Sequence, residues 1–164
     1  EPVRLQQLKS ILETQGMRCS KSQLQETIEQ LRQNYQATSL ELVALAEGYR
    51  FRVKSAYSSW LVRLDHKELV KLSRALLETL TIIAYKQPIT RAEIQDIRGV
   101  SVNTQILKTL LGYGWVKIAG HREVPGKPAL WQTTDKFLSD LELQRLSDLP
   151  PLKEIVDINE ITEA

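Results

Sequence analysis

The sequence contains one cysteine, two histidines and no long apolar run. Cys19 has no second cysteine with which to form a disulfide, a composition typical of proteins in a reducing compartment. No segment approaches the ~20 consecutive apolar residues that a membrane-spanning helix needs. His66 and His121 have no cysteine or further histidine at ligand spacing. The sequence therefore predicts neither a disulfide framework nor a metal site.

Motifs that carry catalytic chemistry are also missing. Gly126-Lys127 lacks the upstream glycine and the following serine or threonine of a phosphate-binding loop. Carboxylates such as Glu78, Glu93 and Asp96 suit helix capping and surface solvation. We therefore predict a protein that is not an enzyme and uses no cofactor.

Charge of one sign is not in large excess, because the net charge is only +2. Residues 1–74 hold 12 basic and 8 acidic residues, whereas residues 75–164 hold 10 basic and 12 acidic residues. A DNA-binding domain obtains most of its affinity from a clustered basic face. The distribution is thus a weak indication of DNA binding.

A short phrase occurs twice, 86 residues apart. Residues 1–12 read EPVRLQQLKSIL, and residues 87–98 read QPITRAEIQDIR. In each copy, proline and a β-branched residue precede a helical pattern with apolar residues three apart. The two copies predict two related small domains.

The second half predicts three helices with an extended step after the first. Apolar spacing indicates a helix that ends near Gln87, and Pro88-Ile89 forms the step. Thr90 caps the next helix in a capping box with Glu93, and this helix buries Ile94 and Ile97 before it closes at Gly99. Ser101 begins the third helix, whose predicted inward residues are Val102, Ile106, Leu107, Leu110 and Leu111.

A β-hairpin is expected next, with strands at 115–124 and 129–134 around Pro125-Gly126-Lys127-Pro128. One or two short helices follow within 135–149. Three helices, a short step and a hairpin describe a winged helix, in which the hairpin is the wing.

The first half repeats this plan. Pro2-Val3 is the step, helices are expected at 4–14 and after the cap Ser20, and a hairpin is expected around Glu47-Gly48, followed by a helix at 56–64. A counterpart of the helix at 75–87 does not precede the step. We therefore predict that the first domain lacks its opening helix. Four apolar residues should then be without a packing partner, namely Leu5, Leu8, Leu24 and Ile28.

The predicted fold class is mainly α with small β-hairpins (α+β), in tandem winged-helix domains. The expected divisions are an N-terminal domain at 1–64, a helical connector at 65–74, a C-terminal domain at 75–150 and an acidic, flexible tail at 151–164.

Aromatic residues near the second hairpin are the best candidates for a partner-binding site. Tyr113, Trp115 and Trp131 are residue types that anchor interfaces, although core packing beneath the wing explains each tryptophan equally well. Arg122 and Lys127 are candidates to meet acidic residues at the rim of such an interface.

Nucleic-acid contact is the competing use of the same fold. The third helix of a winged helix enters the major groove, and here its outward face offers only Lys108 as a cation. Lys117 and His121 make the wing mildly basic. These residues suit phosphate contact, but specific base reading looks poor.

Three segments together resemble the segregation and condensation protein B (ScpB) family: ALLETLTIIAYKQPITRAEIQDIRGV at 75–100, QILKTLLGYGWVKIAGHREVPGKPALWQTT at 105–134 and FLSDLELQRLSDLPPL at 137–152. Residues 1–8 and 48–61 are similar more loosely. The resemblance implies a non-enzymatic homodimer, paired through its first domain, that binds the kleisin ScpA. It further implies association through ScpA with the SMC ATPase, in a condensin-like complex that compacts and segregates the chromosome in the cytoplasm at the nucleoid.

Two hypotheses follow. The first is a dimeric adaptor that holds a kleisin helix beside the second wing. The second is a winged-helix DNA-binding transcription regulator, whose binding should weaken steeply with salt.

Overall fold

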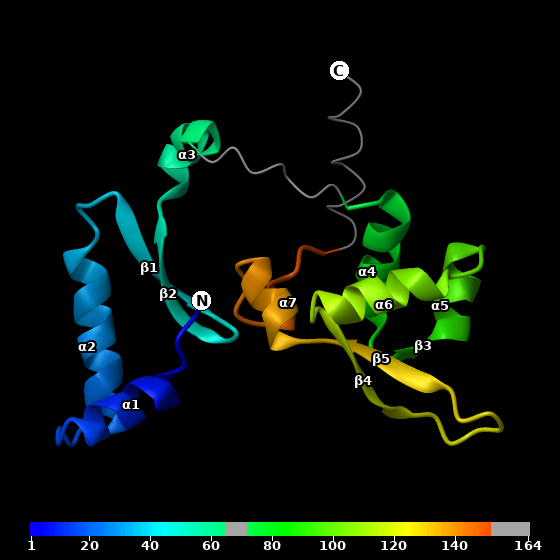
Figure 1. Ribbon diagram of the computed structural model, residues 1–164, viewed down its shortest axis with the longest axis horizontal. Coiled ribbons are helices and arrows are strands. Elements are labelled where there is room, and N and C mark those ends of the chain that lie inside the picture. The colour runs from blue at the N-terminus through cyan, green and yellow to red at the C-terminus, as the bar shows by residue number, and fades with distance from the viewer. Residues whose placement is uncertain (65–71, 152–164) are drawn as a thin grey trace.

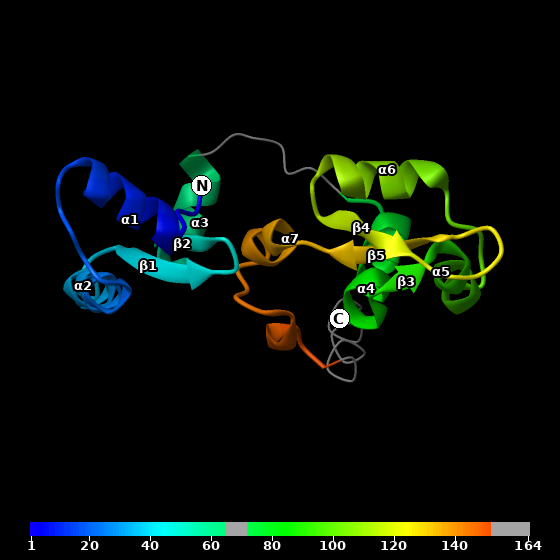
Figure 2. The same cartoon turned by 90° about the horizontal axis from the view of Figure 1, so that it is seen from below.

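The structure is a computed structural model that describes residues 1–64 and 72–151. It contains helices and two small antiparallel sheets, which confirms the predicted α+β class. Two groups of elements lie side by side, with α7 (Asp135–Asp140) facing the hairpin of β1 (Leu40–Leu45) and β2 (Gly48–Val53) (Figures 1 and 2). The predicted connector at 65–74 and tail at 151–164 fall largely outside the described residues. Within these residues, no helix is long and apolar enough to cross a membrane.

The second group follows the predicted order of helix, step, helix, helix and hairpin. Its elements are α4 (Arg74–Lys86), β3 (Ile89–Thr90), α5 (Arg91–Arg98), α6 (Thr104–Gly112), β4 (Val116–His121), β5 (Ala129–Thr133), α7 (Asp135–Asp140) and a 3₁₀ turn (Leu146–Asp148). The strands form one sheet in the order β3-β5-β4. The three helices α4, α5 and α6 contribute the fully buried Ile83, Ile94 and Leu110 to the core under this sheet.

Local signals set most of these boundaries. The Thr90 hydroxyl accepts from the Glu93 N–H, and the Glu93 carboxylate accepts from the Thr90 N–H at 2.9 Å, which completes the predicted capping box. Gly99 ends α5 with a φ of 69°, in the left-handed region that glycine enters without strain.

The predicted start of the third helix was wrong. Helix α6 begins at Thr104 because the Asn103 side chain accepts from the Gln105 N–H and caps it there. Val102, predicted inside the helix, is instead held in the preceding loop, where its carbonyl accepts from Arg91 at 2.5 Å. Two residues predicted to be buried also lie at the surface: Ile97 is 53% exposed and Leu111 is 41% exposed.

The first group is smaller. It consists of α1 (Leu5–Thr14), α2 (Lys21–Asn34), β1 (Leu40–Leu45), β2 (Gly48–Val53), a 3₁₀ turn (Ser55–Tyr57) and α3 (Ser58–Leu64). The expectation that its apolar residues lack packing partners was wrong. Leu24 and Ile28 are buried against Leu42 of β1, and Leu5 and Leu8 pack on this cluster. The hairpin therefore supplies the partner that the sequence left unassigned.

The repeated phrase has the same structural role in both groups. Val3 and Tyr49 exchange two backbone hydrogen bonds of 2.8 and 2.9 Å, which joins the first step to the hairpin strand β2. In the second group, Ile89 of β3 pairs with Trp131 of β5. Each step thus adds to the second strand of its hairpin, opposite an aromatic residue.

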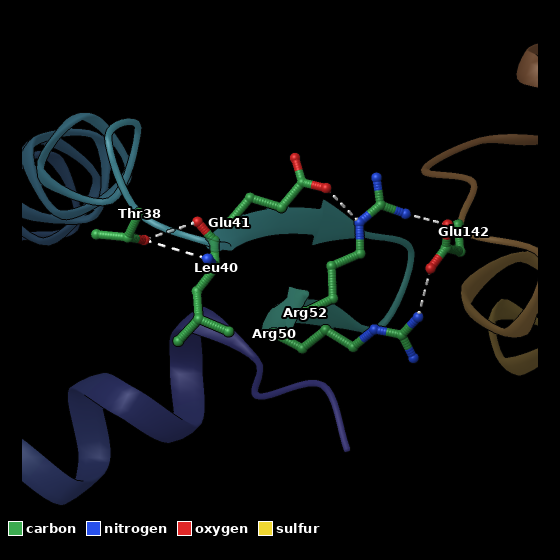
Figure 3. A network of polar contacts seen from close by, with 6 residues as sticks. All are labelled: Thr38, Leu40, Glu41, Arg50, Arg52 and Glu142. Atoms are coloured by element: carbon green, nitrogen blue, oxygen red, sulfur yellow. Dashed lines mark hydrogen bonds and ion pairs between the residues drawn. The ribbon is translucent and has the colours of Figure 1, made fainter. Parts of the chain in front are cut away.

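The two groups meet where the turn of the first hairpin reaches α7 and the segment after it. The Ala46 N–H donates to the Leu143 carbonyl at 3.1 Å, and the Glu47 N–H donates to the Ser139 hydroxyl at 2.9 Å. Figure 3 shows Arg50 and Arg52 both directed at Glu142, with Arg50 at 3.0 Å from its carboxylate. Hydrogen bonds from Arg52 lower the pKa of Glu142. This joint brings the first hairpin and α7 together.

Candidate partner-binding surface

Two of the predicted anchors lie together at the start of the wing. Tyr113 caps the end of α6 and Trp115 precedes β4, and their ring centroids are 4.9 Å apart. Tyr113 is 37% exposed and Trp115 is half-buried, so part of this aromatic pair is open to solvent. An exposed aromatic pair held by a helix end and a strand is a suitable anchor for a partner.

Helix α7 supports this pair with an ion pair. The Trp115 indole N–H donates to Asp140 at 2.8 Å, and Lys136 lies 2.7 Å from the same oxygen. Partial burial opposes ionisation of Asp140, but hydrogen bonds from Lys136 and Trp115 outweigh it and lower the pKa of Asp140. We name Tyr113, Trp115, Lys136 and Asp140 the aromatic platform.

The aromatic platform borders a groove between the two groups of elements. This groove has a volume of about 520 Å³, and Lys136 and Asp140 form one wall. The start of the chain and the first hairpin supply the remaining lining residues, Glu1, Pro2, Arg4, Gln7, Glu47 and Arg50. Lys136 and Asp140 were not among the predicted residues, because no local pattern indicates which surface α7 packs against.

The other predicted rim residues lie at the far end of the wing. Arg122 follows β4, and Lys127 is in the hairpin loop with a φ of 37°. A six-residue strand separates them from Trp115, which corresponds to about 20 Å. The structure therefore does not bring the five predicted partner-binding residues into one site.

Arg122 is held within the structure by the capping box of α5. Its guanidinium is 2.7 Å from Glu93, whose other oxygen accepts from the Thr90 N–H and hydroxyl. Hydrogen bonds from Thr90, with Arg122 adding to them, lower the pKa of Glu93 to about 2. One carboxylate thus caps α5 and fixes the base of the wing loop.

Replacing Glu93 with glutamine should lower the free energy of unfolding by about 1 kcal/mol at neutral pH, the usual size of a capping contribution. Because the folded pKa of Glu93 is depressed, its charge stabilises the fold above the unfolded pKa of about 4.3. That contribution is lost as the pH falls towards 2. Urea titrations of both proteins at several pH values measure the difference. A difference in the free energy of unfolding that stays constant between pH 7 and pH 2 would contradict this account.

Trp131 does not lie at the surface. It is 9% exposed in the central strand β5 and belongs to the apolar core of the second group, with Ile89 and Ile118 as its cross-strand neighbours. Of the two interpretations that the sequence left open for Trp131, the structure places it in the core. We therefore do not include it in the proposed contact surface.

The predicted nucleic-acid residues are exposed, but they form only a sparse cationic surface. Lys108 on α6 and Lys117 and His121 on β4 are all exposed, and none makes an ion pair with a described residue. The nearby arginines have internal partners. Arg91 donates to the Val102 carbonyl, and the side chain of Arg98, only 8% exposed, pairs with Glu78 at 3.1 Å. These arginines thus add little to a phosphate-binding face.

Metal-ligating side chains do not gather in the part of the chain that the structure describes. No group of three or more histidine, cysteine, aspartate or glutamate residues there is arranged to hold an ion. Cys19 is half-buried beside the apolar cluster of Leu24, Ile28 and Leu42 in the first group.

Comparison with known families gives one match that covers nearly the whole chain. The family described as "Segregation and condensation complex subunit ScpB" matches residues 1–152. A segregation and condensation protein B homolog from Coxiella burnetii is 42% identical over 161 residues, which cover 98% of this chain and 77% of the relative. Segregation and condensation protein B from Syntrophotalea carbinolica is 40% identical over 163 residues, which cover 99% and 81%.

Solved structures include a similar chain from Mycobacterium tuberculosis, described as ScpB. It is 27% identical, with 87% of this chain and 86% of that chain covered, and its TM-score is 0.42. A conserved hypothetical protein from Chlorobium tepidum is 33% identical, with coverage of 87% and 88% and the same TM-score of 0.42.

Proposed function

This chain belongs to the family of segregation and condensation complex subunit ScpB, and from that premise we propose that it is a non-enzymatic adaptor that binds an ScpA-type kleisin. Through the kleisin it joins an SMC ATPase in chromosome condensation and segregation at the nucleoid. The observation that carries the proposal is the family match, which extends over residues 1–152. Co-purification of this chain with the ScpA and SMC proteins of its own organism tests the proposal. Light scattering then measures the mass of each assembly. Recovery of ScpA without this chain would overturn the proposal.

We place the kleisin contact on the aromatic platform. Tyr113 and Trp115 offer apolar ring surface, and Lys136 and Asp140 beside them offer hydrogen bonds at the edge. An amphipathic helix of the partner would lay its apolar face on the rings. Arg122 and Lys127, about 20 Å away, would meet acidic residues only on a partner that follows the whole wing.

Replacing Trp115 with alanine should weaken ScpA binding about 30-fold, as truncation of an aromatic anchor typically does. Lys127→Ala at the wing tip is the matched control, because it removes an exposed side chain far from the platform and should change binding less than threefold. Isothermal titration with purified ScpA measures both, and circular dichroism verifies folding. Unchanged affinity in a folded Trp115→Ala protein would rule out this surface.

Dimerisation through residues 1–64 is part of the proposal. Ile11 on α1 and Met17 after it are more than half exposed, which leaves apolar surface on the first group for a second copy. Light scattering of the chain alone, with and without Ile11→Glu, tests this, and a monomeric wild-type mass would contradict it.

DNA-binding regulation is the alternative, and the exposed Lys108, Lys117 and His121 favour it. Because the described face of α6 and β4 presents so few cations without an ion-pair partner, we expect no saturable duplex binding below about 10 µM at 0.15 M salt. Anisotropy titrations with a labelled duplex at several salt concentrations measure this. Tight binding that falls steeply with salt and is lost in Lys108→Glu would favour the regulator over the adaptor.

A further inference from the structure

The outer edge of β1 has backbone groups without partners. The Lys54 N–H donates to the Ser39 carbonyl, and the register continues from this pair to Leu45 opposite Gly48. In an antiparallel ladder, alternate residues face the partner strand, so the odd-numbered residues of β1 face β2. The N–H and C=O groups of the even-numbered residues therefore point away from the sheet.

Both ends of this edge are occupied. At one end, the Thr38 hydroxyl lies 3.1 Å from both the N–H nitrogen and the carbonyl oxygen of Leu40, as Figure 3 shows. At the other end, the Ala46 N–H donates to Leu143. Between them, the outward groups of Leu42 and Ala44 have no hydrogen-bond partner among residues 1–64 and 72–151. The edge therefore has an open window of two donors and two acceptors.

A groove runs along this window. Its volume is about 430 Å³, and its floor is the continuous run Glu41–Leu45 of β1. The end of α2 forms one wall, and the segment after α7 contributes to the other. The lining residues from these two segments are Arg32, Tyr35, Gln36, Glu142 and Gln144, whereas Arg52 and Lys54 come from β2 and the residue after it. The groove thus has the length of a short extended segment.

The groove has cationic charge that is not neutralised. Glu41 and Glu142, its two carboxylates, both pair with Arg52. The Lys54 ammonium donates to the Gln36 carbonyl at 2.6 Å and has no carboxylate within ion-pair distance in the described part of the chain. Because Lys54 lies opposite Ser39, this unpaired charge is at the Leu40 end of the window. A ligand with a carboxylate at that end would complement it.

We propose that the outer edge of β1 is a docking site for a short, extended, acidic segment of another protein, which adds to the sheet as an antiparallel strand. Two residues of that segment, two apart, exchange hydrogen bonds with Leu42 and Ala44. In this direction the C-terminal end of the segment lies at Lys54, so the acidic residue follows the paired residues. This site is distinct from the aromatic platform and extends the proposed function.

A second copy of the chain fits this groove less well than a peptide. Besides β1 itself, the groove is lined by residues at the end of α2 and by Glu142 and Gln144 after α7. If a second copy docked through its own β1, its α2 and its residues 142–144 would have to occupy the same space. The occupant is therefore a segment without bulky flanking structure.

Fluorescence anisotropy with the labelled peptide Thr-Val-Thr-Val-Asp and the whole chain tests the proposal. Ala44→Pro removes one outward N–H at an edge position where proline is tolerated, and it should weaken binding about tenfold or more. Ala44→Ser, which keeps the N–H, is the matched control and should bind within twofold of wild type. The peptide with lysine in place of aspartate should bind more weakly. Equal binding by Ala44→Pro, or by the lysine peptide, would overturn the proposal.

Amide hydrogen exchange gives a second readout that needs no variant. Leu42 and Ala44 should exchange faster than Val43 and Leu45 in the free protein and become protected when the peptide is added. Absence of added protection at a saturating peptide concentration contradicts the site.

Light scattering tests the alternative that a second copy of the chain covers the edge. An oligomer that Ala44→Pro dissociates would show that it does. Neither result depends on ScpA, so this proposal and the adaptor function fail separately.

Discussion

Replacing Trp131 with alanine should lower the free energy of unfolding by about 3–5 kcal/mol, the range for removing a large aromatic side chain from a core. Trp131 is on the central strand of the β3-β5-β4 sheet and belongs to the apolar core of the second group. Its removal leaves a cavity that neighbouring strands on both sides prevent from collapsing. Urea denaturation followed by circular dichroism measures the change.

Trp131→Phe is the matched control for this substitution. Phenylalanine keeps an aromatic ring between Ile89 and Ile118, and the expected loss is only about 1–2 kcal/mol. The folded Trp131→Phe protein should also retain ScpA affinity, whereas Trp115→Ala should lose affinity and retain its fold. A Trp131→Ala protein as stable as wild type, or a Trp131→Phe protein that folds but does not bind ScpA, would contradict the assignment of Trp131 to the core.

These two tryptophans show how far the sequence could locate a site. Both lie in predicted strands, and residue type alone gives each the same chance of core or surface. The two residues differ in their position in the tertiary structure. Trp131 is on the middle strand, while Trp115 lies beyond the edge strand, where Asp140 of α7 accepts its N–H. No local pattern indicates strand order or the position of α7. The sequence therefore named Tyr113 and Trp115 as candidate anchors, but it did not predict the ion pair of α7 that supports Trp115.

Local signals did predict most elements. Caps and breakers act within a few residues, so the α5 capping box, the stop at Gly99 and both hairpin turns were readable. The start of α6 was not, because Ser101 and Asn103 are both good caps and a contact from Arg91 to Val102 fixes the loop between them. Burial of Leu24 and Ile28 was missed for a related reason. Their partner Leu42 comes from a hairpin strand, at a distance that helix periodicity does not describe.

Replacing Gly48 with alanine should have the second large effect, a loss of about 3 kcal/mol or more of stability in the first group. Gly48 has a φ of 134°, and a Cβ there would lie 2.3 Å from the Val3 carbonyl oxygen and 2.5 Å from its carbon. These atoms are backbone, so they cannot rotate away as a flexible side chain would. The conformation alone costs about 1–3 kcal/mol for a residue with a side chain.

The Cβ of Gly48→Ala would collide with Val3, the residue through which the first copy of the repeated phrase contacts its hairpin. Val3 and Tyr49 exchange backbone hydrogen bonds beside Gly48, and moving Val3 breaks this pair. The equivalent pair in the second group, Ile89 with Trp131, has no glycine beside it. We therefore expect fast exchange of the Val3 and Tyr49 amides in Gly48→Ala, with the second group unchanged.

Gly16→Ala separates strain from collision. Gly16 also has a positive φ, 77°, but nothing lies within 4 Å of its added Cβ, so the cost should be only about 1 kcal/mol. The amount by which Gly48→Ala lowers the free energy of unfolding more than Gly16→Ala does then measures the strength of the contact between the Pro2-Val3 step and its hairpin. Equal losses in the two variants would mean that Val3 moves aside at no cost. In that case the pairing of Val3 with Tyr49 would not contribute to the stability of the first group.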